Sequence, residues 1–339
     1  MKIGRRAIGP GEPVFVVAEA CDNHMGDLSV AQEMVRLAKL AGADAIKFQH
    51  HLPDEEMLSN VPMSDNFEEP LYEFLKKHAL RIEDHAVLQR HCAETGIQYL
   101  CTPFSYKAAE ELNELGVEAF KIGSGEMTDI PSLRRMARFG KPMILSTGMC
   151  TLDEIDETVA AMKEEHAEFA LLNCVSEYPP VYEDVNLRVI ETMSARYPDV
   201  TIGHSDHTPD LFTCFAAVAL GACIIEKHVI IDKLTPGPDQ SVSIDMADLH
   251  ELVTGVRKIE RAMGADKRVH PRERQIREWA FRSVVSLVDI APGDTITADM
   301  VWTKRPGTGI PSKRLPEVIG KRARMPIAAN SLLRWDDLQ

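Results

Sequence analysis

The sequence predicts an α/β protein in which a (β/α)8 TIM barrel precedes a small, mostly-β domain. Short apolar segments recur eight times along residues 13–229, with helix-like stretches between them. The segments are apolar throughout rather than alternating, as is typical of parallel strands buried on both faces. After Gly264, short β-rich runs and Pro-Gly turns replace this pattern. We therefore expect a barrel over residues 1–264, a charged linker over 265–280 and a small β domain over 281–339.

The eight expected strands are short β-forming runs at the spacing of a repeated strand–helix unit. They cover residues 14–20, 44–49, 98–104, 119–124, 142–148, 169–174, 200–206 and 223–229. Eight such units over about 250 residues match a TIM barrel. A doubly wound open sheet is the alternative, but no Gly-x-Gly-x-x-Gly sequence follows the first strand.

Capping signals and one long connection complete the expected barrel. Asp27 precedes a helical stretch that ends near Gly42, and Thr151 with Glu154 has the spacing of a capping box before another helix. Residues 50–82 form an unusually long connection after the second strand. Because long loops after barrel strands are often lids or partner surfaces, we expect this one to serve function.

Composition and charge restrict the class of function. The 339 residues are 45% hydrophobic and 27% charged, with a net charge of −14. This acidity argues against binding to nucleic acid or to an anionic membrane, although a few local basic residues can still bind a small anion. The seven cysteines include no Cys-x-x-Cys pair, which favours buried thiols in a reducing compartment. The N-terminal residues lack the apolar segment of a signal peptide, so we expect a cytoplasmic protein.

Polar residues mark the carboxyl ends of the expected strands, which is where TIM barrels carry their active sites. These residues are Glu19, Lys47, Gln49, Thr102, Lys121, Ser124, Glu126, Ser146, Ser176, Tyr178, Ser205, His207, Lys227 and His228. A single Ser or Thr at a strand end is usually a cap or turn residue. Two lysines within buried strands are harder to explain structurally, because a buried ammonium is costly unless it is paired or faces a ligand. Lys47 and Lys121 therefore indicate a phosphate or carboxylate site, to which the hydroxyls add donors.

Two of the twelve histidines have the placement of metal ligands. His207 and His228 stand at comparable depth on neighbouring strands, which lie about 4.8 Å apart, so they can share one ion and leave positions open for a substrate oxygen. Spacing alone leaves open the alternative that both are core histidines bonded to the backbone. Along the same strand, we expect His204 to be structural and Asp206 to orient its neighbours. The histidines expected to be solvated are His50, His51, His78, His85, His91 and His166.

Short motifs along nearly the whole chain resemble those of the sialic acid synthases. In order they are EACDNHMGD, AIKFQ, CTPFS, FKIGSGEM, STGM, SEYP, GHSDHT, EKHVIID and GPD. The tail KRPGTGI…VIGKRA resembles the C-terminal antifreeze-like (SAF) domain of the same family. The resemblance implies a TIM barrel joined to an SAF domain. It also implies an enzyme that condenses phosphoenolpyruvate with an open-chain amino-sugar aldehyde and releases inorganic phosphate.

The resemblance assigns roles to individual residues. It implies that phosphoenolpyruvate is bound by Lys47, Thr102, Lys121, Ser124, Ser146 and Ser205. It implies that His207 and His228 hold a divalent metal, typically Mn²⁺, with Mg²⁺ or Co²⁺ as alternatives. It makes Glu19 and Glu126 the catalytic carboxylates, with their separate roles left open. It implies sugar contacts from Gln49, Ser176, Tyr178, Asp239 and Arg305. Arg305 would reach into the barrel of a partner subunit, which implies a domain-swapped homodimer.

Two stretches depart from the family pattern. Gln240 and Ser241 follow the GPD motif where the family often has His and Lys, and Cys21 and Asp22 replace a small or aliphatic pair. Both changes concern the sugar end, so the acceptor stays open between N-acetylmannosamine and a legionaminate, pseudaminate or spore-coat type of sugar. A metal-dependent pyruvate aldolase and a non-catalytic sugar-binding protein are the competing functions.

Overall fold

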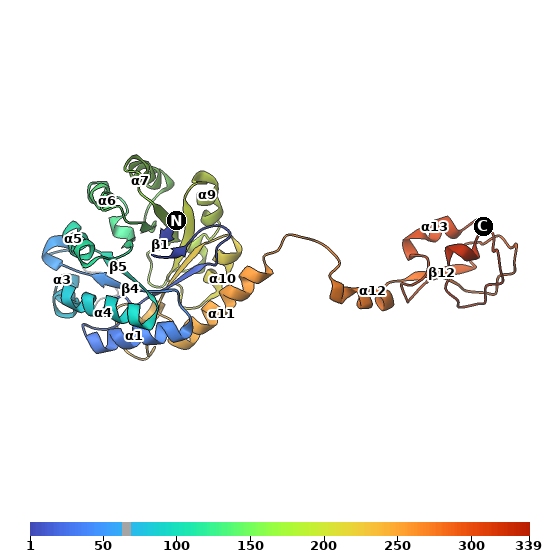
Figure 1. Cartoon of the computed structure of the whole chain (residues 1–339), viewed down its shortest axis with the longest axis horizontal. Helices are drawn as coiled ribbons and strands as arrows, with labels where there is room; N and C mark the ends of the chain where they lie inside the picture. The colour runs from blue at the N-terminus through green and yellow to red at the C-terminus, as the bar shows by residue number, and fades with distance from the viewer. Residues whose placement is uncertain (63–68) are drawn as a thin grey trace. The chain divides into compact units, whose positions relative to one another are not determined.

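The computed structural model describes residues 1–62 and 69–339. These residues form two compact units, Met1–Gly264 and Ala265–Gln339 (Figure 1). Part of the long connection expected to be a lid, residues 63–68, lies outside the described residues. The rest of that connection contains two short helices, α2 (Pro53–Glu56) and α3 (Leu71–His78).

The first unit contains a parallel eight-stranded barrel, which confirms the predicted fold class. Its strands are β3 (Phe15–Glu19), β4 (Ala45–His50), β5 (Gln98–Pro103), β6 (Phe120–Ile122), β7 (Met143–Ser146), β8 (Phe169–Cys174), β9 (Thr201–Asp206) and β10 (Ile224–His228). The ladder runs β5-β4-β3-β10-β9-β8-β7-β6. Strands β5 and β6, both fully described, pack side by side at the seam without a hydrogen-bonded ladder.

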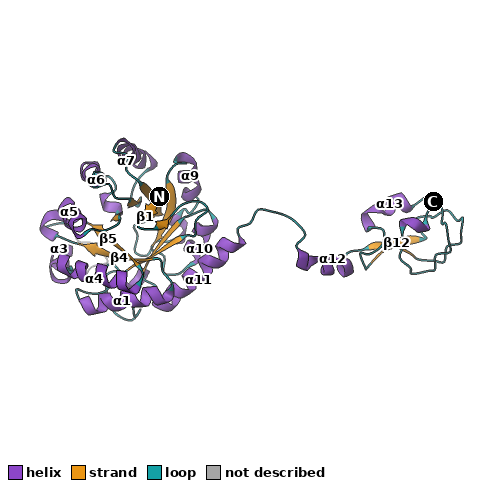
Figure 2. Ribbon diagram, in the orientation of Figure 1, coloured by secondary structure: helices purple, strands orange, loops and turns teal. Residues whose placement is uncertain are grey.

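Helices surround the strands, as Figure 2 shows. They are α1 (Leu28–Ala41), α4 (Ile82–Thr95), α5 (Tyr106–Leu115), α6 (Ile130–Ala137), α7 (Leu152–Glu164), α8 (Tyr182–Val185), α9 (Val189–Arg196), α10 (Phe212–Ala219) and α11 (Met246–Ala262). The predicted caps are confirmed. The Asp27 side chain accepts from the N–H groups of Ser29 and Val30, and Thr151 with Glu154 forms a capping box. These bonds satisfy N–H groups that have no partner inside the helix.

The amino end of the barrel is filled by apolar side chains. Inward residues of several strands, including Phe15, Leu100 and Ile144, form one buried cluster with Ile3 and Ile8. Ile3 and Ile8 belong to or flank a short N-terminal hairpin, β1 (Lys2–Ile3) paired with β2 (Arg6–Ala7). This hairpin therefore closes the amino end, and polar chemistry is confined to the carboxyl end.

Three histidines that were expected to be solvated are buried, so that prediction is wrong. His50 and His85 contact each other edge to face and are 1% and 0% exposed, and His51 is 6% exposed. His50 bonds to Glu111 and His85 to the hydroxyl of Tyr99, so one ring nitrogen of each finds a partner. His78 and His91 are half-buried, and His166 is exposed as expected.

The second unit has a core of its own, built around Val284, Val301 and Leu333. Its strands β11 (Ser283–Ser286) and β12 (Val301–Lys304) pair antiparallel, and isolated bridges extend the β structure. Its helices are α12 (Arg274–Ala280) and α13 (Leu315–Val318). The short 3-10 helices of the chain are Ser124–Glu126, Gln240–Val242, Pro271–Glu273, Ser312–Arg314 and Trp335–Asp337.

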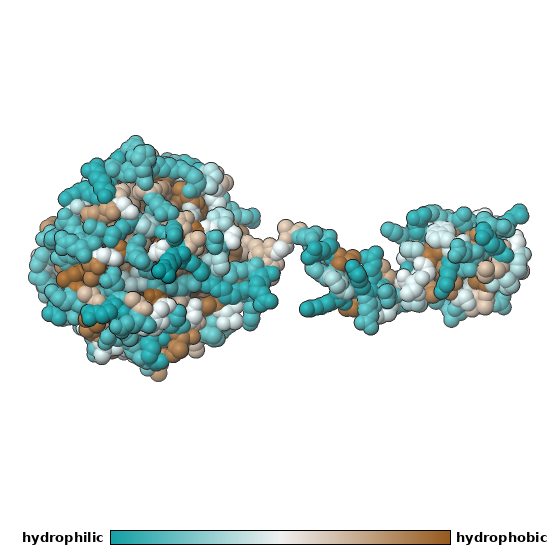
Figure 3. Space-filling view, in the orientation of Figure 1, coloured by the Kyte–Doolittle hydropathy of each residue, from teal (hydrophilic) through white to brown (hydrophobic). Residues whose placement is uncertain are grey.

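The visible surface of the barrel unit is mostly hydrophilic, whereas hydrophobic atoms emerge over α12 (Figure 3). Ile276, Trp279 and Phe281 at this helix are each more than half exposed. Among the described residues, the helices are all too short or too polar to cross a membrane.

Candidate active site

A cavity of about 390 Å³ opens at the carboxyl ends of the barrel strands, a volume typical of small-molecule sites. All barrel residues with a predicted catalytic, binding or metal role line it. These are Glu19, Lys47, Gln49, Thr102, Lys121, Ser124, Glu126, Ser146, Ser176, Tyr178, Ser205, His207, His228 and Asp239. Arg305 belongs to the second unit.

A buried group of two lysines and two glutamates occupies the middle of the cavity. Lys47 Nζ lies 2.8 Å from Glu19 Oε2 and 3.7 Å from Glu226 Oε1, and Lys121 Nζ lies 3.4 Å from Glu226 Oε1. All four side chains are at most 5% exposed. Burial disfavours the charge of Lys47, but Glu19 and Glu226 outweigh it and raise the pKa of Lys47. At Lys121 burial outweighs the attraction of Glu226 and lowers the pKa, so both lysines depend on the nearby carboxylates to hold their charge before any ligand enters.

Glu226 is the residue of this group that the sequence analysis missed. Burial alone would raise its pKa, but Lys121 and Lys47 reverse the effect and lower it. Its Oε1 accepts from the Ser205 hydroxyl at 3.1 Å, whereas its Oε2 is buried with no hydrogen-bond partner among the described residues. Glu226 stands two residues before His228. A strand period of two places both on the same face, and that signal would have found it.

Hydroxyl groups accept hydrogen bonds from both lysines. Its Nζ donates to Ser146 Oγ at 2.7 Å, and Lys47 Nζ donates to Thr102 Oγ1 at 3.1 Å. The Gly148 N–H donates to Ser124 Oγ at 3.1 Å. A Cβ on Gly148 would lie 2.7 Å from that oxygen, so a larger residue at this position would displace the Ser124 hydroxyl. Lysines, hydroxyls and backbone N–H groups together form a pocket suited to an oxyanion.

The two predicted catalytic carboxylates have different surroundings. Glu19 is 1% exposed and accepts from Gln49 Nε2 at 2.7 Å; burial raises its pKa and Lys47 opposes the rise. Glu126 is half-buried at the cavity wall, and burial raises its pKa to about 7. Its Oε2 has no hydrogen-bond partner among the described residues. A carboxyl that titrates near neutral pH can both donate and accept a proton.

A buried histidine that the sequence analysis assigned to solvent lies beside Gln49. His51 Nε2 contacts Gln49 Oε1 at 3.0 Å, and its Nδ1 contacts Glu56 at 3.0 Å. Asp22 Oδ2 lies 3.8 Å from His51 Nε2. No periodicity marks this arrangement, since it depends on how the long connection folds back over the strand ends. Polar groups on this side of the cavity suit a polyhydroxylated ligand.

The two predicted metal ligands lie together. The rings of His207 and His228 are 5.0 Å apart between centroids and nearly perpendicular, and Tyr178 stacks on His207. His207 Nδ1 lies 2.7 Å from the Val175 carbonyl, so it carries the proton and leaves the Nε2 lone pair free. Burial lowers the pKa of His207 to about 4 and holds that of His228 well below its usual value. Neutral imidazoles are the form that binds a metal ion, so these residues fit a divalent cation.

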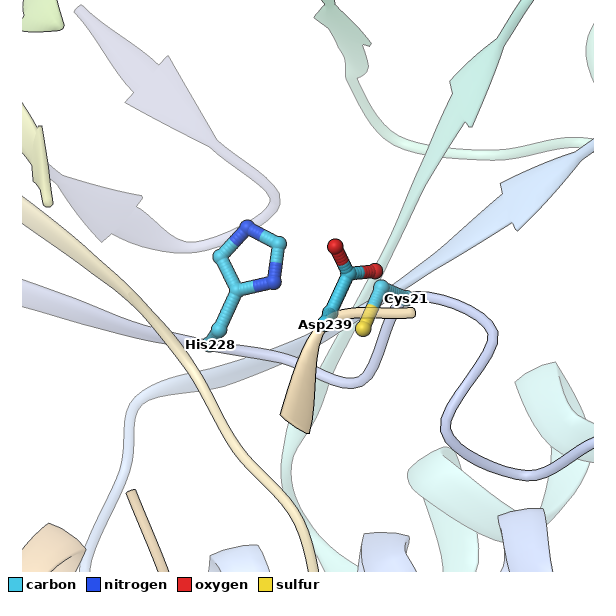
Figure 4. A group of neighbouring side chains, drawn as sticks. All are labelled: Cys21, His228 and Asp239. Atoms are coloured by element: carbon cyan, nitrogen blue, oxygen red, sulfur yellow. The ribbon is translucent and has the colours of Figure 1, made fainter. Parts of the chain in front are cut away.

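Two further donors lie beside His228. Cys21 Sγ, a carboxylate oxygen of Asp239 and a ring nitrogen of His228 are all within 4.8 Å of one another (Figure 4). His228 Nδ1 is buried and has no hydrogen-bond partner among the described residues. Burial raises the pKa of Asp239 to about 7, although a bond from Cys21 acts in the opposite direction. Asp239 was expected to contact the sugar, whereas no role was predicted for Cys21.

The outward faces of β9 and β10 carry a different buried charge pair. Lys227 Nζ lies 2.5 Å from Asp206 Oδ2. The hydroxyls of Thr208 and Thr213 also donate to Asp206, each at 2.8 Å. His204 Nδ1 bonds to the Asn173 carbonyl at 3.0 Å. As expected from alternation along the strand, Asp206 orients its neighbours rather than facing the cavity.

Comparison with known proteins extends over both units. The NeuB family matches residues 34–268, and the SAF domain matches residues 281–339. The chain is 35% identical over 352 residues to N,N'-diacetyllegionaminic acid synthase of Legionella pneumophila, covering 99% of this chain and 98% of that one. It is 37% identical over 324 residues to human N-acetylneuraminate-9-phosphate synthase, covering 94% and 90% of the two chains.

A solved structure shows the same arrangement of strands and helices. The N-acetylneuraminic acid synthetase of Leptospira borgpetersenii, in complex with citrate, superposes with a TM-score of 0.75 at 34% sequence identity. The superposition covers 81% of this chain and 94% of that one.

Proposed function

The chain belongs to the NeuB family and is an enzyme of the sialic-acid-synthase type, and we propose that it condenses phosphoenolpyruvate with an open-chain amino-sugar aldehyde. The products would be a sialic-acid-like 3-deoxy-ulosonic acid and inorganic phosphate. One observation carries the proposal: a single cavity joins a lysine- and hydroxyl-lined anion pocket to a pair of neutral histidines. A pyruvate aldolase would need no such pocket for a phosphoryl group.

The anion pocket would bind phosphoenolpyruvate. Lys47 and Lys121 supply positive charge, and Thr102, Ser124 and Ser146 supply hydroxyl donors around them. Ser205 now donates to Glu226 and would turn to the ligand. A phosphate or carboxylate between the lysines would share them with Glu19 and Glu226, so substrate binding rearranges a charge network that is already in place.

His207 and His228 would hold the divalent cation, with Mn²⁺ as the first candidate and Mg²⁺ or Co²⁺ as alternatives. When bound, the cation would polarise the aldehyde oxygen as a Lewis acid. Tyr178 stacks on His207 and contacts the edge of His228, so it fixes the two rings in place. Gln49, Ser176 and Asp239 would then orient the sugar chain beside the histidines.

The reaction needs one new carbon–carbon bond and one broken carbon–oxygen bond. Carbon 3 of phosphoenolpyruvate attacks the aldehyde carbon, and the aldehyde oxygen takes a proton. Water adds to carbon 2, where positive charge develops, and phosphate leaves from that carbon. We assign proton delivery to Glu126, because its pKa of about 7 leaves much of it protonated at neutral pH. Glu19, anchored by Lys47 and Gln49, would stabilise the positive charge at carbon 2.

The acceptor would be N-acetylmannosamine or a related hexose, including a diacetamido hexose of the legionaminate type. His51, Asp22 and Cys21 line or flank the sugar end of the cavity. The Legionella relative named for N,N'-diacetyllegionaminic acid covers almost the whole chain, which keeps that sugar among the first to test.

Arg305 would complete the cavity of a second copy in a domain-swapped homodimer. The exposed Arg305 guanidinium lies 5.4 Å from the Trp279 ring, and its Nε donates to the Ala280 carbonyl at 3.1 Å. Exposed Ile276 and Phe281 lie on or next to the same short helix. An arginine held in place beside exposed apolar residues suits an interface with a partner. In this arrangement residues 265–280 serve as the linker between the barrel and the SAF domain.

We place the enzyme in the cytoplasm, without nucleic acid or membrane as partner. All seven cysteines lie in the described part of the chain and are free thiols, which suits a reducing compartment. The net charge of −14 disfavours polyanions.

The decisive experiment offers phosphoenolpyruvate, Mn²⁺ and a panel of aldoses to the purified protein. Phosphate release and the mass of the ulosonic acid are measured together. We expect phosphate only when an acceptor aldose and a divalent ion are both present, and none after treatment with EDTA. Phosphate release without an aldose contradicts the proposal, and full activity of Lys47→Ala with pyruvate favours the aldolase instead.

A further inference from the structure

We propose that Cys21 contributes a thiolate ligand to the metal site, which would then be held by Cys21, Asp239 and His228 next to His207. Such a site favours a borderline ion such as Zn²⁺ or Co²⁺ over Mg²⁺ or Mn²⁺. The inference rests on the proposed function only in placing the cation at the two histidines. It adds Cys21 as a ligand, moves Asp239 from the sugar to the cation, and changes the choice of ion.

The backbone at Cys21 is the first observation. Cys21 follows the carboxyl end of β3 with a φ of +41°, in the left-handed region that residues other than glycine rarely adopt. Such conformations persist only where the surroundings impose them, and they concentrate at ligand sites. In Figure 4 the Cys21 sulfur lies on the Asp239 side of the chain that carries it. The unusual turn therefore places a thiol next to a carboxylate and an imidazole.

The second observation is the spacing of the three donors. Their ligand atoms lie within 4.8 Å of one another. Around one tetrahedral zinc, bonds of 2.0–2.3 Å separate the ligand atoms by about 3.5 Å. Small side-chain rotations would close that difference. Cys21 is fully buried and His228 is 5% exposed, so a bound ion would lie against protein on this side.

The third observation is an unused ring nitrogen. His228 Nδ1 is buried and has no hydrogen-bond partner in the described part of the chain. Figure 4 shows the ring nitrogen nearest the Cβ-bearing carbon on the side of Asp239 and Cys21. An unpaired buried nitrogen is costly, and a cation between it and the thiol would remove the cost. A purely structural role for the Cys21 thiol would explain neither why His228 Nδ1 is unpaired nor why it is directed toward Cys21.

The chemistry of the donors sets the preferred ion. A thiolate is a soft ligand that selects zinc-like ions, whereas Mg²⁺ and Mn²⁺ favour oxygen ligands. Binding would release the thiol proton to solvent, with no change of oxidation state. The cation would then be held by a thiolate, a carboxylate and up to two imidazoles. Any water or substrate oxygen completes the remaining positions.

The test uses the full-length protein stripped of metal and titrated with Co²⁺. A sulfur ligand gives a strong sulfur-to-cobalt charge-transfer absorption in the near ultraviolet. We expect this band in the wild type, its loss in Cys21→Ser, and its retention in Cys174→Ser. Cys174 is the matched control because it is a buried thiol that lines the same cavity. Absence of the band in the wild type, or its survival in Cys21→Ser, overturns the inference.

A second variant protects the test from misfolding. Cys21→Gly adopts a positive φ without strain, so it folds even if the serine variant does not. In this variant we expect the ratio of Zn²⁺ to Mn²⁺ affinity, measured by competition, to fall at least about tenfold. An unchanged ratio overturns the thiolate role. Condensation by a protein that binds Co²⁺ without the sulfur band would defeat this inference and leave the proposed function intact.

Discussion

Strands β9 and β10 carry buried charged groups on both of their faces, and the two faces differ in one respect. On the outward face, Asp206 accepts from Lys227, Thr208 and Thr213, so the carboxylate is surrounded by donors. On the inward face, Glu226 Oε2 and His228 Nδ1 are buried without hydrogen-bond partners among the described residues. The Asp206 carboxylate is therefore paired within the protein, whereas the inward group has atoms available for a ligand.

Burial and charge alone do not identify a site. Lys227 and Asp206 are 0% and 1% exposed, as buried as any residue of the cavity, and they match across neighbouring strands. Their bonds are internal, so they hold β9 against β10 and fix the depth of His207 and His228. His204 Nε2 on the outward face is also buried without a hydrogen-bond partner among the described residues, so the cavity is distinguished by unpaired carboxylate and imidazole atoms that lie beside open space.

Breaking the outward pair should have the largest effect, and on stability. Lys227→Met leaves the Asp206 carboxylate buried without its cation, which should lower the free energy of unfolding of the barrel by about 3–5 kcal/mol. Chemical denaturation measures this loss. The double variant Asp206→Leu, Lys227→Met should recover much of it, because no buried charge remains. Equal stability of Lys227→Met and the wild type would contradict the structural role.

Acid should weaken the same pair. Burial opposes ionisation of Asp206, but His204, 3.5 Å away, and Lys227 hold its pKa well below the usual value. Because the folded pKa is below the unfolded one, this stabilisation is complete above the unfolded pKa of about 3.9 and is lost as the pH falls further. Between pH 5 and 2, the free energy of unfolding should therefore fall more steeply with decreasing pH in the wild type than in the double variant. Chemical denaturation at each pH measures this dependence.

Breaking the inward group should affect catalysis more than stability. Lys121→Met removes one cation from the anion pocket, so kcat/KM for phosphoenolpyruvate should fall by about 10²–10³-fold. Lys47 remains in the pocket of this variant, with its Nζ 3.7 Å from Glu226 Oε1. Lys163→Met is the matched control, since Lys163 is an exposed lysine paired with Asp199 on a barrel helix. A normal kcat/KM for Lys121→Met would remove the basis for the anion pocket.

The pH profile should reveal Glu126. Its pKa is about 7 because it is partly buried, so the protonated donor is lost as the pH rises through 7. We expect kcat to decrease above that pH in the wild type. Glu126→Gln should lower kcat by about 100-fold and remove the decrease. Activity that instead increases through pH 7 would show that Glu126 acts as a base.

The smallest effect should come from His204. It lies on the outward face and bonds to the Asn173 carbonyl, so His204→Gln should keep the metal and lose only about 1 kcal/mol of stability. His207→Ala should lose most of its metal affinity. Titration calorimetry with Mn²⁺ compares the two. Loss of metal by His204→Gln would place the cation on the wrong face of β9.

Strand positions were predictable because burial on both faces leaves a continuous apolar run in the sequence. Each observed strand, from β3 to β10, lies within its expected range or extends one residue beyond it. The lining residues followed from the rule that barrel strands end at the site. Glu226 was missed although it shares the face of His228. His85 was missed although it stands three residues before buried Leu88 on α4, which is the spacing of a buried helix face.

Other features depend on tertiary structure that sequence patterns do not encode. His51 is buried because the long connection folds back onto the strand ends, where Glu56 and Gln49 bond to its ring. Cys21 was noted as a departure from the family motif, but its approach to Asp239 requires a turn with positive φ and a loop more than two hundred positions away in the chain. Contacts of that range are set by the closed ring of strands.

The N-terminal hairpin that fills the amino end of the barrel has a consequence for traffic through the enzyme. With Ile3 and Ile8 buried among the inward side chains of the strands, the described residues close the amino end and leave the carboxyl end for access to the cavity. Both reactants must enter, and both products must leave, by the same mouth. A product that has not yet departed would therefore block the next turnover. The whole catalytic cycle would then depend on the rate of product release.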